Sequence, residues 1–270
     1  MSERDRCNGM KVCVCVKHVP DPNLSPQVDL RTRRLLRDPA HSILDPADEY
    51  GIETALRLIE QHGGEVVAVS MGPPEAEDAL RRAMAMGADR AILVSDSALA
   101  GSDVLSTARV LAEVIRPERP DLVICATEST DAYTGLLPGA LAALLDLPQL
   151  TFARSVSVQG SIVTVQRATE TGHQVVQASL PALVTVTASV GEPRYPSFKR
   201  LMAAKRRAIE QYTLAMLGLD PSAVGEAGAR EMVLDLSEVR QVKQGRRVVD
   251  DGDGSAVEDI LAFLHAIQVL

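Results

Sequence analysis

The residues best suited to bind a small ligand form one polar segment, residues 127–135, with the sequence TESTDAYTG. An apolar run at residues 121–126, typical of a buried strand, precedes it, and an apolar helix begins near Leu136. The hydroxyls, carboxylates and free backbone amides of such a loop suit the ribose or phosphate of a nucleotide. A loop that only caps the helix has the same composition, so the residues alone leave both interpretations open.

A second candidate contact is Gly101-Ser102-Asp103, at the start of a helix-favouring segment. Backbone N–H groups at a helix start bind phosphate, and Thr107 adds a hydroxyl one turn later. Ser102 or Asp103 is equally suited to cap the helix without any ligand. The chain contains neither GxGxxG nor GxxxxGK followed by Ser or Thr, which disfavours a conventional dinucleotide fold and a P-loop NTPase.

Motifs for catalysis are sparse. The histidines are scattered without HExxH, and no GxSxG is present. His18 follows a predicted strand and could face a ligand, although a surface or capping role is favoured. Asp45, Asp48 and Glu49 cluster three carboxylates, but acids are also favoured where a helix begins, so we favour the structural interpretation. No motif requires bond-making chemistry.

Composition narrows the functional classes. The chain has 270 residues, 46% of them hydrophobic, and a net charge of −8. It has no Trp, three Phe and four Tyr, so both its acidity and its few aromatic rings argue against a nucleic-acid partner. Its apolar runs are too short to span a membrane, and residues 1–10 lack the apolar core of a signal peptide. We therefore expect a soluble, cytoplasmic protein without membrane insertion.

The cysteines do not predict a disulfide framework in a chain of this length. Cys13 and Cys15 alternate within an apolar strand pattern, so their side chains share one face. A metal or redox pair is conceivable there, but ordinary buried packing is favoured. The remaining cysteines are Cys7 and Cys125.

The first half of the chain alternates between two patterns. Apolar runs at residues 11–16, 65–71, 90–95 and 121–126 predict strands that are buried on both faces. Segments 48–61, 74–86 and 103–115 have the apolar spacing of helices, and residues 27–37 predict a small hairpin. This alternation predicts an α/β fold with a doubly wound parallel sheet. Such sheets bind ligands at the carboxyl ends of their strands, where both candidate contacts lie.

In the second half of the chain the spacing of the apolar residues changes. Short strands are expected at residues 156–158, 162–167, 174–178 and 183–187, as an antiparallel meander that extends the same sheet. From residue 220 the chain is irregular and charged, with a last apolar helix over residues 256–267. We therefore predict a nucleotide-binding domain over residues 1–220. Residues 221–270 would form a C-terminal arm that wraps over its own domain or a partner.

The segment at residues 180–210 joins three unlike compositions. A β-branched strand is followed by a loop with two prolines and a glycine, which leaves Glu192, Arg194 and Tyr195 exposed as a contact surface. A basic stripe, Lys199, Arg200 and residues 205–207, comes next. Such a stripe on an acidic protein suggests a docking site for a negative partner.

These same residues carry a family resemblance. LPALVT followed by GEPRYPSFKRLMAAKR is similar to the closing segment of the β subunit of electron transfer flavoproteins. The similarity runs from residue 10 to about residue 220, and loosely over residues 248–270. The other matching landmarks are KVCVCVKHVPD, LDPADEYGIETAL, EVVAVSMGPPEAEDALRRAMAMGADRAILV, DLVICATEST and LDLPQLTFA.

The resemblance implies an adenine-nucleotide α-hydrolase-like fold, as in universal stress proteins, and an electron carrier that is not catalytic in itself. It implies a heterodimer with an α subunit that holds most of the FAD, while the β subunit supplies one wall and buries a structural AMP. Electrons would come from flavoprotein dehydrogenases, such as the acyl-CoA dehydrogenases of fatty acid β-oxidation. They would pass to a quinone oxidoreductase at the membrane.

The resemblance also assigns site residues, to which we add the predicted helix-start contact. No catalytic residue and no metal ligand is expected. The predicted cofactor-binding residues are Cys15, Asp45, Pro46, Ala47, Asp48, Met71, Gly101, Ser102, Asp103, Thr107, Ala126, Thr127, Glu128, Ser129, Thr130, Asp131, Thr134, Gly135, Leu136 and Leu137. The predicted partner-recognition loop is Val190, Gly191, Glu192, Pro193, Arg194 and Tyr195.

The chain departs from the family pattern at three places, one of which is Thr171, where glycine or aspartate is usual. STDAYTGLLPG is unlike both common forms of the nucleotide loop, one rich in aspartate and asparagine and the other close to DGDTAQVGP. The second form can hold FAD in place of AMP and takes part in electron bifurcation, so the nucleotide is open between the two. Val190 stands where a leucine commonly anchors the recognition loop.

Two alternatives of other classes remain. One is an adenine-nucleotide hydrolase or ligase on the same fold, prompted by Ser102, Thr107 and Asp131. The other is a nucleotide sensor that resembles universal stress proteins. The meander and the arm argue against a sensor, which needs neither.

Overall fold

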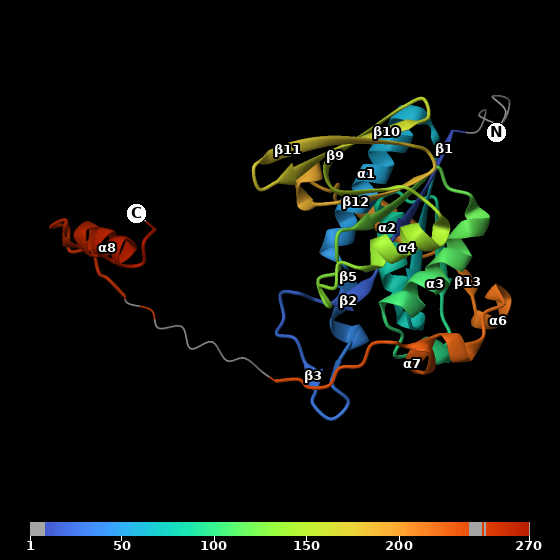
Figure 1. The fold of residues 1–270 in the computed structure, drawn as a ribbon, viewed down its shortest axis with the longest axis horizontal. Helices are drawn as coiled ribbons and strands as arrows, with labels where there is room; N and C mark the ends of the chain where they lie inside the picture. The colour runs from blue at the N-terminus through green and yellow to red at the C-terminus, as the bar shows by residue number, and fades with distance from the viewer. Residues whose placement is uncertain (1–8, 238–244, 246, 270) are drawn as a thin grey trace. The chain divides into compact units, whose positions relative to one another are not determined.

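A nine-stranded, mostly parallel sheet forms the centre of the larger of two units, Met1–Leu234 and Asp235–Leu270 (Figure 1). The computed structural model describes residues 9–237, 245 and 247–269. The strand order is β11-β10-β9-β12-β8-β1-β6-β7-β13. These strands are β1 (Met10–Cys15), β6 (Gly64–Met71), β7 (Arg90–Val94), β8 (Leu122–Ala126), β9 (Gln149–Gln159), β10 (Ile162–Thr169), β11 (Gly172–Ser179), β12 (Ala182–Val186) and β13 (Glu210–Tyr212).

Helices cover both faces of this sheet, which confirms the predicted doubly wound α/β fold (Figure 1). One core cluster joins the strands to α1 (Pro46–His62) and α2 (Glu77–Met86). The other joins them to α3 (Val104–Ile115) and α4 (Leu137–Leu145). β8 is apolar along its whole length and β7 from Ala91 onward, because each face of these strands packs against a helix layer. The four strands and three helices expected in the first half of the chain are all present.

The second half differs from the expectation in three details. Strands β9, β10 and β11 form the predicted antiparallel meander, but β9 begins at Gln149 rather than near residue 156. Strand β12 is parallel to β8 and β9 and lies inside the sheet. All five residues of β12 are buried, whereas burial alternates along β9. That continuous burial is the property of a parallel strand, and it separates β12 from the meander. Strand β13, at the sheet edge, was not expected.

Two small two-stranded sheets lie in the long connection between β1 and α1. Strand β2 (His18–Pro20) pairs with β5 (Ser42–Leu44). Strand β3 (Val28–Asp29) pairs with β4 (Arg34–Leu35) and forms the predicted hairpin. A 3-10 turn over Pro39–His41 precedes β5.

The order of the strands reverses at β1. From β1 the chain builds β6 and β7 on one side, then crosses to place β8 on the other. Strand β1 pairs in parallel with both β6 and β8. The carboxyl ends of these three strands therefore meet at the switch point, where doubly wound sheets form a ligand crevice.

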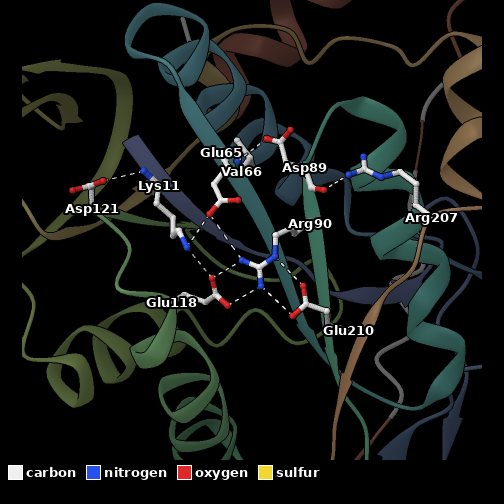
Figure 2. Close-up of polar contacts among 9 residues, drawn as sticks. All are labelled: Lys11, Glu65, Val66, Asp89, Arg90, Glu118, Asp121, Arg207 and Glu210. Atoms are coloured by element: carbon white, nitrogen blue, oxygen red, sulfur yellow. Dashed lines mark hydrogen bonds and ion pairs between the residues drawn. The ribbon is translucent and has the colours of Figure 1, made fainter. Parts of the chain in front are cut away.

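A network of charges lies at the amino ends of the strands, opposite the ligand crevice (Figure 2). The Arg90 guanidinium donates to both carboxylate oxygens of Glu118 and to both of Glu210, at 2.7–3.0 Å. Lys11 Nζ lies 2.8 Å from Glu65 and 3.2 Å from Glu118. Hydrogen bonds from Arg90 lower the pKa of the Glu118 carboxyl. The network ties the edge strand β13, through Glu210, to β7 and to the 3-10 turn at Arg116–Glu118.

We expect Arg90→Met to lower the free energy of unfolding by about 1–2 kcal/mol at pH 7, since partly exposed ion pairs contribute little each. The folded pKa of Glu118 lies below its unfolded value of about 4.3. The network therefore stabilises the fold above that pH, and its contribution is lost as the pH falls through the folded pKa. Urea unfolding at pH 7 and pH 3 should show a smaller difference at pH 3. Arg154→Met, at an exposed position on β9, is the control. An equal loss in the control would contradict the assignment.

Short elements and one further helix complete the chain. They are α5 (Phe198–Ala204), α6 (Leu214–Leu217), α7 (Gly225–Gly228) and, in the second unit, α8 (Ser255–Ala266). Helix α8 exposes Val257, Ile260 and Phe263. The domain boundary after residue 220 and the wrapping of the arm stay predictions. No helix in residues 9–237 and 247–269 is long and apolar enough to cross a membrane.

Candidate functional site

A cavity of about 410 Å³ lies at the switch point of the sheet. This volume is within the range of pockets that bind small ligands, about 300–1,000 Å³. Its lining comes from the ends of β1, β6 and β8, the start of α3 and the loop before α4. The predicted site residues that line it are Cys15, Asp48, Met71, Gly101, Ser102, Asp103, Thr107, Ala126, Glu128, Ser129, Thr134, Gly135 and Leu137.

Three sulfur-containing residues line the cavity: Cys15, Met71 and Cys125. Cys15 is the last residue of β1 and Cys125 the second-last residue of the adjacent strand β8, and both are free, buried thiols. A hydrogen bond with Cys125 and burial together raise the pKa of the Cys15 thiol, so it stays neutral. Cys13 packs in the same apolar cluster as Cys15. Buried packing of both residues, as predicted, is confirmed, whereas Cys7 lies outside the described residues.

One wall of the cavity is basic. Lys17 and Arg37 line it, and both bind the carboxylate of Asp131. Lys17 Nζ lies 2.6 Å from Asp131 Oδ1, and Arg37 donates to Oδ2 through Nε at 2.9 Å and Nη2 at 2.7 Å. Burial alone would raise the pKa of Asp131, but these two cations outweigh it and hold the pKa below its usual range. The two cations exceed the charge of Asp131 by one, while Asp103, Glu128 and Glu231 bring carboxylates to other parts of the lining.

The start of helix α1 supplies two buried carboxylates with different tasks. Asp45 accepts hydrogen bonds from the backbone N–H groups of Ala47, at 3.0 Å, and Thr130, at 2.8 Å. It therefore caps α1 and holds the loop after β8. Asp48 lines the cavity and accepts a 2.7 Å hydrogen bond from the backbone N–H of Lys17. Burial, with Asp45 nearby, raises the pKa of the Asp48 carboxyl above its usual range.

The start of helix α3 combines capping with cavity lining. Asp103 Oδ1 accepts a 2.8 Å hydrogen bond from the N–H of Ser106, as an N-cap does. Ser102 Oγ donates to Leu99 O at 2.8 Å. Both residues also line the cavity, with Gly101 and Thr107. The capping interpretation is therefore correct here, and it does not exclude a ligand.

Several predicted site residues do not line the cavity, although most lie close to residues that do. Thr127 Oγ1 donates to Val186 O and joins the loop to β12. Leu136 is 59% exposed. The complete set of predicted residues outside the lining is Asp45, Pro46, Ala47, Thr127, Thr130, Asp131 and Leu136. Asp45, Thr130 and Asp131 instead position the loop through the contacts given above.

The lining also includes residues outside the predicted set, among them His18, for which a surface or capping role was favoured over a ligand contact. Lys17 and His18 follow β1, at a strand end that the fold argument selects, and the sequence contains that signal. Arg37 and Glu231 have no such signal, because they reach the cavity from distant parts of the chain. Nε2 of His18 is buried and has no hydrogen-bond partner among residues 9–237, 245 and 247–269. A buried polar atom of this kind calls for a partner that the chain does not supply.

These features fit an adenine mononucleotide. The volume suits a ligand of that size, the basic wall suits a phosphate, and Ser102, Thr107 and Ser129 bring hydroxyls to the lining. Apolar residues of the lining, such as Leu99 and Leu111, suit a purine ring. No group of three or more His, Cys, Asp or Glu within residues 9–237 and 247–269 is placed to hold a metal.

The loop at residues 190–195 is held against helix α1 by two arginines. Arg194 binds Glu53 through its backbone N–H at 3.1 Å and through Nε at 2.7 Å, and it also contacts Glu60. Arg57 donates from its guanidinium to the carbonyls of Val190 and Glu192. Glu53 has only 5% of its side chain exposed, so its partners are needed to satisfy a buried charge. The loop therefore has a fixed conformation.

The side chains of this loop divide into exposed and inward-facing ones. Tyr195 is 83% exposed, and its ring centroid lies 4.8 Å from the Arg82 guanidinium carbon. Glu192 is also exposed. Val190 is partly buried against the core, so it differs from the exposed anchor that a recognition loop needs. Tyr195 is the better candidate for that task.

The basic stripe after the loop is less free than its composition indicated. Arg200 Nη1 donates to Met86 O at 3.1 Å, and Arg207 donates to the carbonyls of Ala88 and Asp89 (Figure 2). These bonds satisfy carbonyls at and after the end of α2, which packs against α5. The stripe therefore fastens α5 to the domain. This structural use of Arg200 and Arg207 weakens the expectation of a separate docking patch.

Comparisons with known proteins cover nearly the whole chain. The family model of the electron transfer flavoprotein domain matches residues 34–217. The electron transfer flavoprotein subunit beta of Mycobacterium leprae is 36% identical, over 96% of this chain and 99% of its own. That of Thermoanaerobacterium thermosaccharolyticum is 34% identical, over 97% and 100%. The caffeyl-CoA reductase-Etf complex subunit CarD of Acetobacterium woodii is 34% identical, over 80% and 83%.

Proposed function

The chain belongs to the electron transfer flavoprotein family as a β subunit, and from this membership we propose how its cavity and its loop serve electron transfer. The subunit forms a heterodimer with an α subunit in the cytoplasm. The α subunit holds most of a shared FAD, and the β subunit supplies one wall of that site. FAD supplies the redox chemistry when it is bound. The β chain positions the flavin and its partners rather than performing catalysis itself.

The cavity at the switch point holds AMP as a structural ligand. Lys17 and Arg37 face the phosphate, and Ser129, Thr107 and Asp48 offer polar groups to the rest of the nucleotide. A nucleotide that binds only the folded chain stabilises it by mass action, by about 2.7 kcal/mol at one hundred times its dissociation constant. The observation that carries this proposal is the position of the cavity, at the strand ends where the fold predicts a ligand.

The loop at residues 190–195 receives the electron donor. Its backbone is fixed on α1, and Tyr195 and Glu192 are exposed for contact. Flavoprotein dehydrogenases, such as acyl-CoA dehydrogenases, supply electrons in fatty acid β-oxidation, and a quinone oxidoreductase accepts them. An exposed aromatic ring on a rigid backbone is a common centre of binding energy at protein interfaces.

A bifurcating carrier, with a second FAD in place of AMP, is the alternative. The departure of STDAYTGLLPG from both common forms of the nucleotide loop leaves this alternative open. The identity of the nucleotide in the β cavity separates the two. An adenine-nucleotide hydrolase of the same fold is a weaker alternative, which ATP turnover by the purified chain would support. Bound, unhydrolysed AMP would count against it.

Co-expression with the α subunit tests the carrier function. We expect a yellow heterodimer whose flavin absorbance is bleached when an acyl-CoA dehydrogenase and its substrate are added. Reoxidation by a quinone oxidoreductase should restore the absorbance. A β chain that stays monomeric beside the α subunit, or a heterodimer whose flavin no dehydrogenase reduces, would contradict the proposal.

A further inference from the structure

A segment near the end of the larger unit, residues 225–233, reaches the cavity at Glu231 and is called the strap. It begins with α7 and includes Glu231, which lines the cavity. In Figure 1 this orange segment passes beside the hairpin formed by β3 and β4. We propose that the strap is the closing element of the nucleotide site, so that AMP enters or leaves only when the strap detaches. This inference rests on the proposed binding of AMP in that cavity.

The first anchor of the strap is Gly225. Its N–H donates to Ser102 Oγ at 3.0 Å, and the next N–H, of Glu226, donates to Ala100 O at 3.0 Å. Gly225 has a φ of +62°, and a Cβ added there would lie 1.9 Å from Ala98 O. Only glycine allows the backbone to approach so closely. The strap therefore starts in direct contact with the segment that opens α3.

The second anchor is Asp103. Its Oδ2 accepts a 2.7 Å hydrogen bond from the N–H of Arg230, while Oδ1 caps α3 through Ser106. Burial alone would raise the pKa of Asp103, but these N–H donors outweigh it and lower the pKa. One ionised carboxylate thus joins the strap to the helix start. Ser102 and Asp103, which line the cavity, are the same residues that hold the strap.

The third anchor is the hairpin. Arg34 forms a 3.1 Å ion pair with Glu226, and Arg33 Nη1 donates to Val233 O at 3.3 Å. Arg37, shortly after this hairpin in the sequence, lines the cavity as part of its basic wall. The strap is therefore fastened both to the start of α3 and to the hairpin that precedes the basic wall.

The strap is held at its start by a buried residue, but the rest of it makes few buried contacts. Val224, just before the strap, is fully buried and keeps that end in place. Beyond Gly225 the strap contributes little buried surface, since Met232 is 76% and Val233 is 53% exposed. The ion pair of Arg34 with Glu226 is exposed, and such pairs contribute little stability. Segments with few buried contacts open locally without global unfolding.

The release rate of AMP from the purified heterodimer tests the strap. The bound nucleotide is labelled, excess unlabelled AMP is added, and the loss of label is followed. We expect Gly225→Ala to accelerate release about ten-fold or more, because hydrogen bonds at the first two anchors are lost. Gly218→Ala is the matched control: it has a φ of +66°, but no atom lies within 4 Å of the added Cβ. Its release rate should equal that of the wild type.

Arg230→Pro is the second variant and removes the N–H that donates to Asp103, together with the exposed side chain of Arg230. Ala229 already has the extended conformation that a following proline favours, with φ −66° and ψ 135°. This variant should also accelerate release, and it serves if Gly225→Ala does not fold. Equal rates in these variants, the control and the wild type would overturn the strap while leaving AMP binding intact. A wild-type complex without AMP would instead overturn both proposals.

Discussion

Asp131→Asn is expected to lower the free energy of unfolding by about 2–3 kcal/mol at pH 7. The carboxylate is 1% exposed and binds both Lys17 and Arg37. Asparagine keeps the shape but lacks the charge, so two cations lose their common partner. Breaking a fully buried pair costs about 3–5 kcal/mol, and the cost is smaller here because both cations are partly exposed to water. Urea unfolding of the purified chain measures the loss.

The same variant should respond differently to pH. The folded pKa of Asp131 lies below its unfolded value of about 3.9. Its stabilising contribution is therefore present above that pH and is lost as the pH falls through the folded pKa. The difference between wild type and Asp131→Asn should shrink between pH 7 and pH 3. Asp146→Asn, at a left-handed position that asparagine tolerates, should change stability by a few tenths of a kcal/mol at most. A pH-independent difference would show that packing, not charge, explains the loss.

Arg194→Ala is expected to release the loop at residues 190–195 and to slow electron transfer from the dehydrogenase. The substitution removes the bonds to Glu53 and Glu60, and it leaves the buried Glu53 carboxylate with Arg57 alone. We expect a loss of about 2 kcal/mol in stability and a reduction in kcat/KM for the donor of at least ten-fold. The FAD content should not change. Flavin reduction by the dehydrogenase, at varied carrier concentration, measures the effect.

Two further variants show whether Arg194 acts by positioning the loop. In a double-mutant cycle, Glu53→Gln and Arg194→Ala should cost less together than the sum of their separate effects, because both break one contact. Arg206→Ala removes an exposed positive charge of the basic stripe and should leave the donor kinetics unchanged. If Arg206→Ala slows transfer as much as Arg194→Ala, net charge rather than loop conformation controls docking. Loss of FAD in Arg194→Ala would show that the loop supports the flavin site instead.

Much of the fold could be predicted because its signals are local. The strands at β1, β6, β7 and β8 are continuous apolar runs, and helix α1 is marked by Asp45 and Pro46 at its start. The orientation of β12 was missed because pairing depends on distant strands, although its burial on both faces held the signal. Strand β13 has only three residues and pairs with a strand far away in the sequence, so no local pattern marks it.

The site could be predicted where it follows from strand ends, and not where it depends on contacts across the chain. Cys15, Met71 and Ala126 line the cavity because they end parallel strands. Asp131 has the composition of a ligand contact, yet Lys17 and Arg37 occupy its carboxylate. Arg37 and Glu231 line the cavity only because the hairpin and the strap fold back over the strand ends. A single sequence carries no local pattern that marks contacts between residues so far apart in the chain.

Quantification of the nucleotides released from the purified heterodimer tests the central claim most directly. The complex is denatured, and the released nucleotides are identified by mass spectrometry and counted per heterodimer. A β subunit that buries AMP beside a flavin-holding α subunit should release one FAD and one AMP. A complex that releases a single FAD and no other nucleotide would contradict the assignment of the cavity. Release of two FAD molecules would show that the cavity serves the bifurcating alternative.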